Sequence, residues 1–200
     1  MQKASPQEFK NVAFENFINR FKVGYFDGRN VISSMDYYED SGAREVAHGI
    51  KKGDKSAMLT AAKDMAKHIP DGYTIIPTPS SGGKATDTLI IANMISEITG
   101  AQVADIVSGE KRKSLYDMKK SGENIDGDLF HYTLTGEVPE KAIILDTVFD
   151  TGRTISAVSD ALGGDSCIAI VHSHVNKNIT KHSNRLIKDA TKEIGQKLRI

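Results

Sequence analysis

The segment IILDTVFDTGRT, residues 143–154, combines residue types that could bind a phosphorylated sugar. Its apolar start is typical of a buried strand, and the small and hydroxylated residues that follow are typical of a turn that opens a helix. A helix start presents free backbone N–H groups to an anion. Four residues lie at this start: Thr151, Gly152, Arg153 and Thr154. The carboxylates of Asp146 and Asp150 would repel a bare phosphate, but they suit ribose hydroxyls or a magnesium ion carried by a polyphosphate.

The segment PTPSSGGKAT, residues 77–86, is the second candidate site. It follows the apolar run YTIIPTP and nearly matches the phosphate-binding P-loop. However, Thr78 stands where that pattern requires its first glycine, and Ala85 stands where it requires a magnesium-binding hydroxyl. The segment is therefore no P-loop, and a flexible glycine turn is the alternative to an anion-binding loop.

Both segments connect strand patterns with helix patterns. Apolar runs predict strands over residues 73–79, 101–107, 142–146 and 167–175. Helical periodicity predicts helices over residues 5–22 and 54–69, between the second segment and Gly100, from Thr154 to Leu162, and in the C-terminal tail. Residues 23–50 are predicted to hold a turn joining short strands. This alternation predicts a parallel α/β sheet with right-handed crossovers, whose ligands bind beyond the carboxyl ends of the strands.

The first segment resembles the signature for 5-phosphoribosyl 1-pyrophosphate (PRPP) in the type I phosphoribosyltransferases, where four apolar residues precede two acidic ones. The match fails at Thr147, which stands in place of the second acid. The resemblance implies that residues 150–154 bind the 5-phosphate, and that Asp146 binds the ribose hydroxyls and is the candidate magnesium ligand. Without the resemblance, the segment is an ordinary strand, turn and capped helix, or the acidic strand end of an NTPase.

The second segment looks like the corresponding part of the competence-protein-F-like branch, where a V-P-V-P segment precedes the pyrophosphate loop. By that resemblance five residues bind pyrophosphate, with the last as its cation: Ser80, Ser81, Gly82, Gly83 and Lys84. The polar segment of residues 108–133 is similar to a mobile loop of the same branch, through GENIDGDLF and through Lys111, Arg112, Lys113 and Ser114. We expect this loop to close over the substrate and exclude water, with a solvated charged loop as the alternative.

Composition limits the setting and the partners. The chain of 200 residues has 26 Lys and Arg against 26 Asp and Glu and a pI near 7.0, so its overall charge gives no reason to bind nucleic acid. Cys167 is the only cysteine, which excludes a disulfide scaffold and favours a reducing, cytoplasmic setting. No apolar run approaches the roughly 20 residues of a membrane span. His172 and His174 lack the neighbouring carboxylates or cysteines of a metal site.

We therefore expect one domain over residues 1–200: a type I phosphoribosyltransferase-like parallel sheet flanked by helices, with a small hood from residues 1–50. The implied enzyme is a pentosyltransferase that moves ribose 5-phosphate from Mg-PRPP, or a related ribosyl pyrophosphate, to a nitrogen of a nucleobase-like heterocycle and releases pyrophosphate. Its expected catalytic residues are Asp146, Asp150 and Lys84, its cofactor is Mg²⁺, its partners are small molecules, and a homodimer is compatible with the sequence.

Two alternatives stay open. The first is a non-catalytic PRPP-sensing or nucleic-acid-associated protein on the same fold, which the missing acid at Thr147 favours. The second is an NTP-dependent enzyme, which the failed P-loop pattern disfavours.

Overall fold

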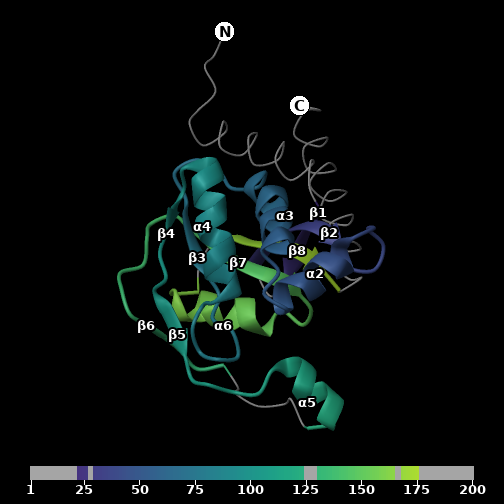
Figure 1. The fold of residues 1–200 in the computed structure, drawn as a ribbon. Helices are drawn as coiled ribbons and strands as arrows, with labels where there is room; N and C mark the ends of the chain where they lie inside the picture. Colours follow the sequence, from purple (N-terminus) through teal and green to yellow (C-terminus); the bar gives the residue numbers. More distant parts are fainter. Residues whose placement is uncertain (1–21, 27–28, 124–129, 165–167, 176–200) are drawn as a thin grey trace, which may run out of the picture.

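The computed structural model describes residues 22–26, 29–123, 130–164 and 168–175. Six strands form the central sheet in the order β1-β2-β8-β7-β3-β4 (Figure 1). Their bounds are β1 Lys22–Phe26, β2 Arg29–Asp36, β3 Thr74–Pro77, β4 Gln102–Val103, β7 Ala142–Phe149 and β8 Ile168–His174. Strand β1 pairs antiparallel with β2, and the other neighbours pair in parallel. The predicted class, a parallel α/β sheet flanked by helices, is confirmed.

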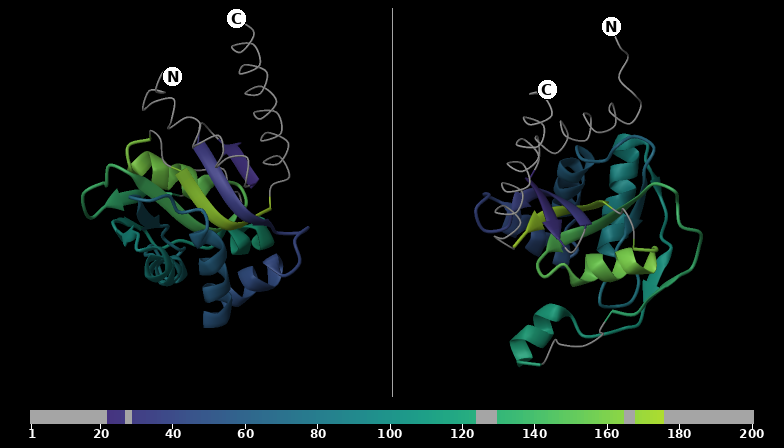
Figure 2. Two further views of the ribbon diagram at one scale, coloured as in Figure 1. Left: turned by 90° about the horizontal axis from the view of Figure 1, so that it is seen from above. Right: turned by 180° about the vertical axis from the view of Figure 1, so that it is seen from behind.

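Helices cover both faces of this sheet (Figure 2). The helices α2 Ala43–Lys51, α3 Lys55–Ala66 and α4 Asp87–Thr99 pack on one face over a core that includes Ile75 and Ile143. Helix α6 Arg153–Ala161 packs on the other face over Ile144 and Val171. Such burial from both sides explains why the central strands are nearly continuous apolar runs. In the described part of the chain, no helix is both long and apolar enough to span a bilayer.

The helix ends follow local sequence signals. Asp54 is the N-cap of α3, and its carboxylate accepts a 2.8 Å hydrogen bond from the Ser56 N–H. Gly100 ends α4 with a φ of 77°, a left-handed conformation that suits glycine. The predicted helices over these two regions are confirmed, whereas the helices expected at the two ends of the chain, and Cys167, lie outside the described residues.

The described part of the expected hood is placed differently. The short strands predicted in residues 23–50 exist, but β2 lies inside the central sheet, paired in parallel with β8, with Ile32 opposite Ile170. Helix α2, which follows it, was not predicted. The strand predicted over residues 101–107 is also divided: β4 ends at Val103, and Val107 begins a strand of a second sheet.

The segment expected as a mobile loop over residues 108–133 has secondary structure of its own. Strands β5 Val107–Gly109 and β6 Tyr132–Leu134 pair antiparallel, and helix α5 Leu115–Ser121 lies away from the central sheet (Figure 1). The secondary structure within this segment was not predicted. Its closure over a substrate stays a prediction.

Candidate functional site

The two segments singled out in the sequence leave the same edge of the sheet. Strands β3 and β7 are parallel neighbours, with Pro77 opposite Leu145. The loop after β3 leads to α4, and the turn after β7 leads to α6. Because the carboxyl ends of adjacent parallel strands meet at one edge, the structure brings the two loops together there, where α/β proteins bind ligands.

Asp146 lies within β7, which continues to Phe149 rather than ending at the carboxylate as predicted. The side chain is partly buried, and its Oδ1 accepts a 2.7 Å hydrogen bond from the Thr147 N–H. Burial raises the pKa of Asp146 to about 6, although the Thr147 N–H, the Thr78 hydroxyl and the positive charge of Arg112 each lower it. The carboxylate is therefore desolvated, and a pKa perturbed in this way is common at functional sites.

The start of α6 borders a small hollow of about 50 Å³. Its lining consists of Asp146, Val148, Phe149, Asp150, Thr151, Gly152, Arg153, Thr154 and Ile155. Gly152 is the N-cap of α6 with a φ of 77°, and its position provides no side-chain hydrogen bond to the first turn. The hollow thus joins a helix start, which favours anions, to the Asp146 carboxylate, and phosphate binding there stays a prediction.

The loop of residues 80–84 folds back on itself. The Ser80 N–H donates to the Lys84 carbonyl at 3.0 Å, and the Gly83 N–H donates to the Ser80 carbonyl at 3.0 Å. The Gly82 N–H donates to the Ser80 hydroxyl at 3.2 Å. Within the described residues, only the N–H groups of Ser81 and Lys84 in this loop make no hydrogen bond. An anion could accept hydrogen bonds from these two N–H groups directly. The N–H groups of Ser80, Gly82 and Gly83 become available only if the turn opens.

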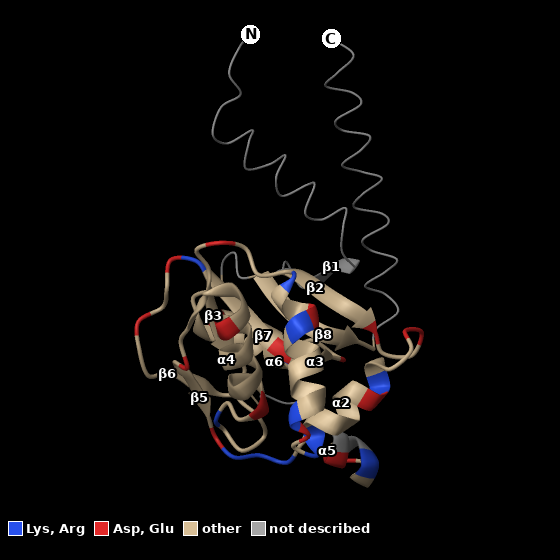
Figure 3. Cartoon of the chain, turned by 45° about the horizontal axis from the view of Figure 1, so that its top comes forward, with Lys and Arg blue, Asp and Glu red and all other residues tan. Residues whose placement is uncertain are grey.

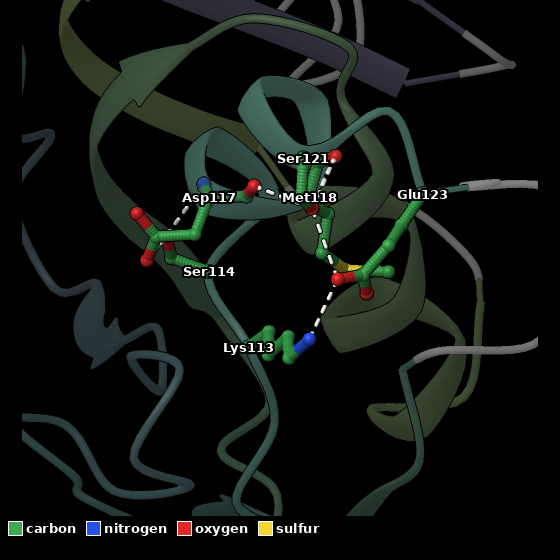
Figure 4. A network of polar contacts seen from close by, with 6 residues as sticks. All are labelled: Lys113, Ser114, Asp117, Met118, Ser121 and Glu123. Carbon is green, nitrogen blue, oxygen red and sulfur yellow. Dashed lines mark hydrogen bonds and ion pairs between the residues drawn. The ribbon is translucent and has the colours of Figure 1, made fainter.

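Lysine and arginine colour the stretch between β5 and α5 (Figure 3), but the basic residues expected in the mobile loop make different contacts. The Arg112 N–H donates to the Ser81 carbonyl at 2.9 Å, and its guanidinium lies 4.3 Å from the centre of the Phe130 ring. Lys113 forms an ion pair with Glu123 at 2.6 Å, and the Ser114 hydroxyl accepts from the Asp117 N–H at the start of α5 (Figure 4). Arg112 thus reaches the site, whereas Lys113 and Ser114 stabilise α5, and Lys111 is exposed.

Sequence reasoning missed two residues beside Asp146. Thr78 is buried, and its hydroxyl lowers the pKa of Asp146. Tyr132 lies on β6, with its ring against the backbone of Gly109. Thr78 follows β3 directly, and that position could have indicated a place at the site. No local pattern in the sequence connects Tyr132 with Asp146.

The carboxylates fit a magnesium ion that arrives with its ligand. In the described ranges, no group of three or more His, Cys, Asp or Glu side chains could hold a metal ion alone. Mg²⁺, however, usually binds through one or two carboxylates together with substrate phosphates, and both Asp146 and Asp150 line the hollow. His172 and His174 are buried on β8, and each has one carboxylate near its Nε2: Asp64 at 3.8 Å from His172 and Asp36 at 3.5 Å from His174. That these histidines bind no metal stays a prediction.

No family model matches the sequence, and no curated protein matches it. Among solved structures, the chain is similar to an orotate phosphoribosyltransferase from Aeropyrum pernix, with 15% identity, a TM-score of 0.40 and coverage of 88% of this chain and 86% of that one. It is also similar to a hypoxanthine phosphoribosyltransferase from Staphylococcus aureus, with 10% identity, a TM-score of 0.36 and coverage of 70% and 67%. At these identities and TM-scores, the likeness assigns neither a family nor a reaction to this chain.

Proposed function

We propose that the protein is a phosphoribosyltransferase, which moves ribose 5-phosphate from Mg-PRPP or a related ribosyl pyrophosphate to a nitrogen of a nucleobase-like heterocycle. One observation carries the proposal. The Asp146 carboxylate on β7 and the start of α6, which follows β7, lie beside the glycine loop that follows the adjacent strand β3. A ligand with a phosphate, a ribose and a pyrophosphate has the groups that these three features bind.

The substrate would lie across the two loops. Its 5-phosphate would accept hydrogen bonds from the backbone around Gly152 at the start of α6. The ribose hydroxyls would donate to Asp146, whose desolvated carboxylate gains polar partners on binding. The pyrophosphate would meet the Ser81 and Lys84 N–H groups and the Lys84 ammonium, which is exposed on the same loop.

The reaction breaks the bond between ribose C1 and pyrophosphate and forms a bond from C1 to the acceptor nitrogen, which loses a proton. Its transition state resembles an oxocarbenium ion, so no protein nucleophile is needed. The Asp146 carboxylate orients the ribose and is an anion near the developing positive charge, while Lys84 stabilises the departing pyrophosphate. Magnesium, bound with the substrate at Asp146 and Asp150, would neutralise charge on that leaving group.

Calorimetry with Mg-PRPP and a pyrophosphate-release assay with a panel of nucleobases test the proposal. We expect the wild-type protein to bind Mg-PRPP, and Asp146→Asn to bind it at least about tenfold more weakly. Asp71→Asn is the matched control, because Asp71 is exposed in the turn before β3, at the opposite edge of the sheet. No binding by the wild-type protein, or equal loss in both variants, would reject the proposal.

A non-catalytic sensor of PRPP is the second candidate, because Thr147 stands where an ordinary PRPP site has a second acid. A hydroxyl is a far weaker partner of a cation than a carboxylate. A sensor binds Mg-PRPP but releases no pyrophosphate with any base of the panel. If the site is an ordinary one that has lost an acid, Thr147→Asp keeps turnover or tightens Mg-PRPP binding. Loss of turnover in a folded Thr147→Asp protein indicates a different substrate.

A further inference from the structure

Tyr132 has a buried hydroxyl that meets no partner in the described part of the chain with the distance and angles of a good hydrogen bond. Buried polar groups almost always have a partner, and an unsatisfied one destabilises the fold by about 1–3 kcal/mol. Several serine hydroxyls in the structure share this property. Tyr132 differs from them because two residues of the candidate site affect its pKa: Arg112 lowers it, as a hydrogen-bond donor and as a positive charge, and the Asp146 carboxylate raises it.

The surroundings of Tyr132 fix where this hydroxyl lies. On β6, Tyr132 is paired with Gly109 of β5, and its ring lies so close to Gly109 that a Cβ there would come within 2.7 Å of it. The Gly109 N–H in turn donates to the Gly83 carbonyl of the glycine loop at 2.8 Å. Tyr132 therefore contacts the residue that is bonded to the glycine loop, and its phenol is near enough to the Asp146 carboxylate for that charge to raise its pKa.

Three neighbours keep the side chain in this place. The Phe130 ring lies 6.2 Å from the Tyr132 ring, centre to centre. The Arg112 guanidinium in turn lies 4.3 Å from the centre of the Phe130 ring. The Tyr132 ring also packs against the core beneath α6. Burial raises the pKa of Tyr132, so the phenol stays protonated at neutral pH and can donate a hydrogen bond.

We propose that Tyr132 is a further substrate-binding residue, whose hydroxyl donates a hydrogen bond to an oxygen of the ribosyl pyrophosphate where its ribose and pyrophosphate parts meet. The inference rests on the proposed function, because it uses that substrate's position across the two loops. Tyr132 comes from the far end of the segment that follows β4, so the hydroxyl also connects this segment with the bound substrate.

Tyr132→Phe removes only the hydroxyl and keeps the ring. We expect this variant to bind Mg-PRPP about tenfold more weakly in calorimetry, the scale of one hydrogen bond to a charged group. Its melting temperature should be unchanged or higher, because an unsatisfied buried hydroxyl is lost. Tyr73→Phe is the matched control: Tyr73 is partly buried against the core just before β3, and we expect wild-type affinity there.

The outcomes separate this inference from the proposed function. If the wild-type protein fails to bind Mg-PRPP, both are rejected. If the wild-type protein and Tyr132→Phe bind Mg-PRPP equally well, the role of Tyr132 is rejected and the proposed function stands. Should Tyr132→Phe melt early, a crystal structure of the wild-type protein with Mg-PRPP decides: a Tyr132 hydroxyl beyond hydrogen-bonding distance of the ligand rejects the role.

Discussion

Gly83 and Gly109 join two parts of the candidate site through their backbones. The Gly109 N–H donates to the Gly83 carbonyl at 2.8 Å, and a Cβ on Gly83 would collide with the Gly109 carbonyl oxygen. A second bond, from the Arg112 N–H to the Ser81 carbonyl, runs beside it. The glycine loop is thereby attached to the base of the segment that holds Arg112 and Tyr132, so a change in one should move the other.

Gly83→Ala should break this attachment. Gly83 has a φ of 86°, and the added methyl group has no room against Gly109, so the loop must shift. We expect at least about tenfold weaker binding of Mg-PRPP by calorimetry. Gly72→Ala is the control: Gly72 has a φ of 76°, nothing lies within 4 Å of its new Cβ, and it lies in the turn before β3, away from the site, so affinity should stay within about twofold of wild type. Equal affinity of the two variants would contradict the attachment.

Gly152→Ala tests the phosphate site at the start of α6. Gly152 and Gly100 share a φ of 77°, so alanine at either position costs about 1–2 kcal/mol of stability. Only Gly152 lies at the candidate site, since Gly100 ends α4 at the opposite edge of the sheet. We expect similar drops in melting temperature but loss of Mg-PRPP binding in Gly152→Ala alone. If Gly152→Ala keeps wild-type affinity, the 5-phosphate does not bind at this helix start.

Asp146→Asn should stabilise the fold while it impairs function. The pKa of Asp146 is about 6 in the folded protein and 3.8 in the unfolded chain, so between these values only the folded protein holds the proton. Wild-type stability therefore falls as the pH rises from about 4 to about 6, and Asp146→Asn lacks this loss. Above pH 6 the variant should be more stable by up to about 3 kcal/mol, with no gain near pH 4.

The functional half of this prediction has the opposite sign. Asp146→Asn should lower kcat/KM, which corresponds to a loss of roughly 2–3 kcal/mol of transition-state stabilisation. The affinity of the wild-type protein for Mg-PRPP should weaken below pH 6, because Asp146 gains its proton there. Urea titrations at several pH values and calorimetry check the two halves. A variant that is less stable than wild type at pH 8 would show that the Asp146 carboxylate supports the fold rather than a ligand.

Hydrogen exchange tests closure of the segment around α5. Most of the described side chains of residues 110–123 are exposed, and helix α5 lies away from the central sheet. We expect their amides to exchange fast in the free protein and more slowly with saturating Mg-PRPP, because bound pyrophosphate attracts Arg112 and its neighbours. Amides of α3 serve as the reference, since they should not respond. Equal exchange of residues 110–123 with and without Mg-PRPP argues against closure.

The sequence alone determined the local elements of this protein. Continuous apolar runs predicted β3, β7 and β8, because strands buried on both faces need no polar alternation. Asp54 and Gly100 marked helix ends through capping chemistry that acts within a few residues. The turn before α6 was predicted for the same reason: its residue types and their order are a local signal.

Only the tertiary structure decided which distant segments meet. Residue Ile32 pairs with Ile170 across most of the chain, which makes β2 a central strand instead of part of a hood. Arg112 and Tyr132 reach Asp146 because the β5–β6 pair attaches to the glycine loop through Gly109. Periodicity reports which face of an element is buried, but the partner on that face is chosen by packing and hydrogen bonding between elements. These long-range contacts have no counterpart in the spacing of residues along the chain.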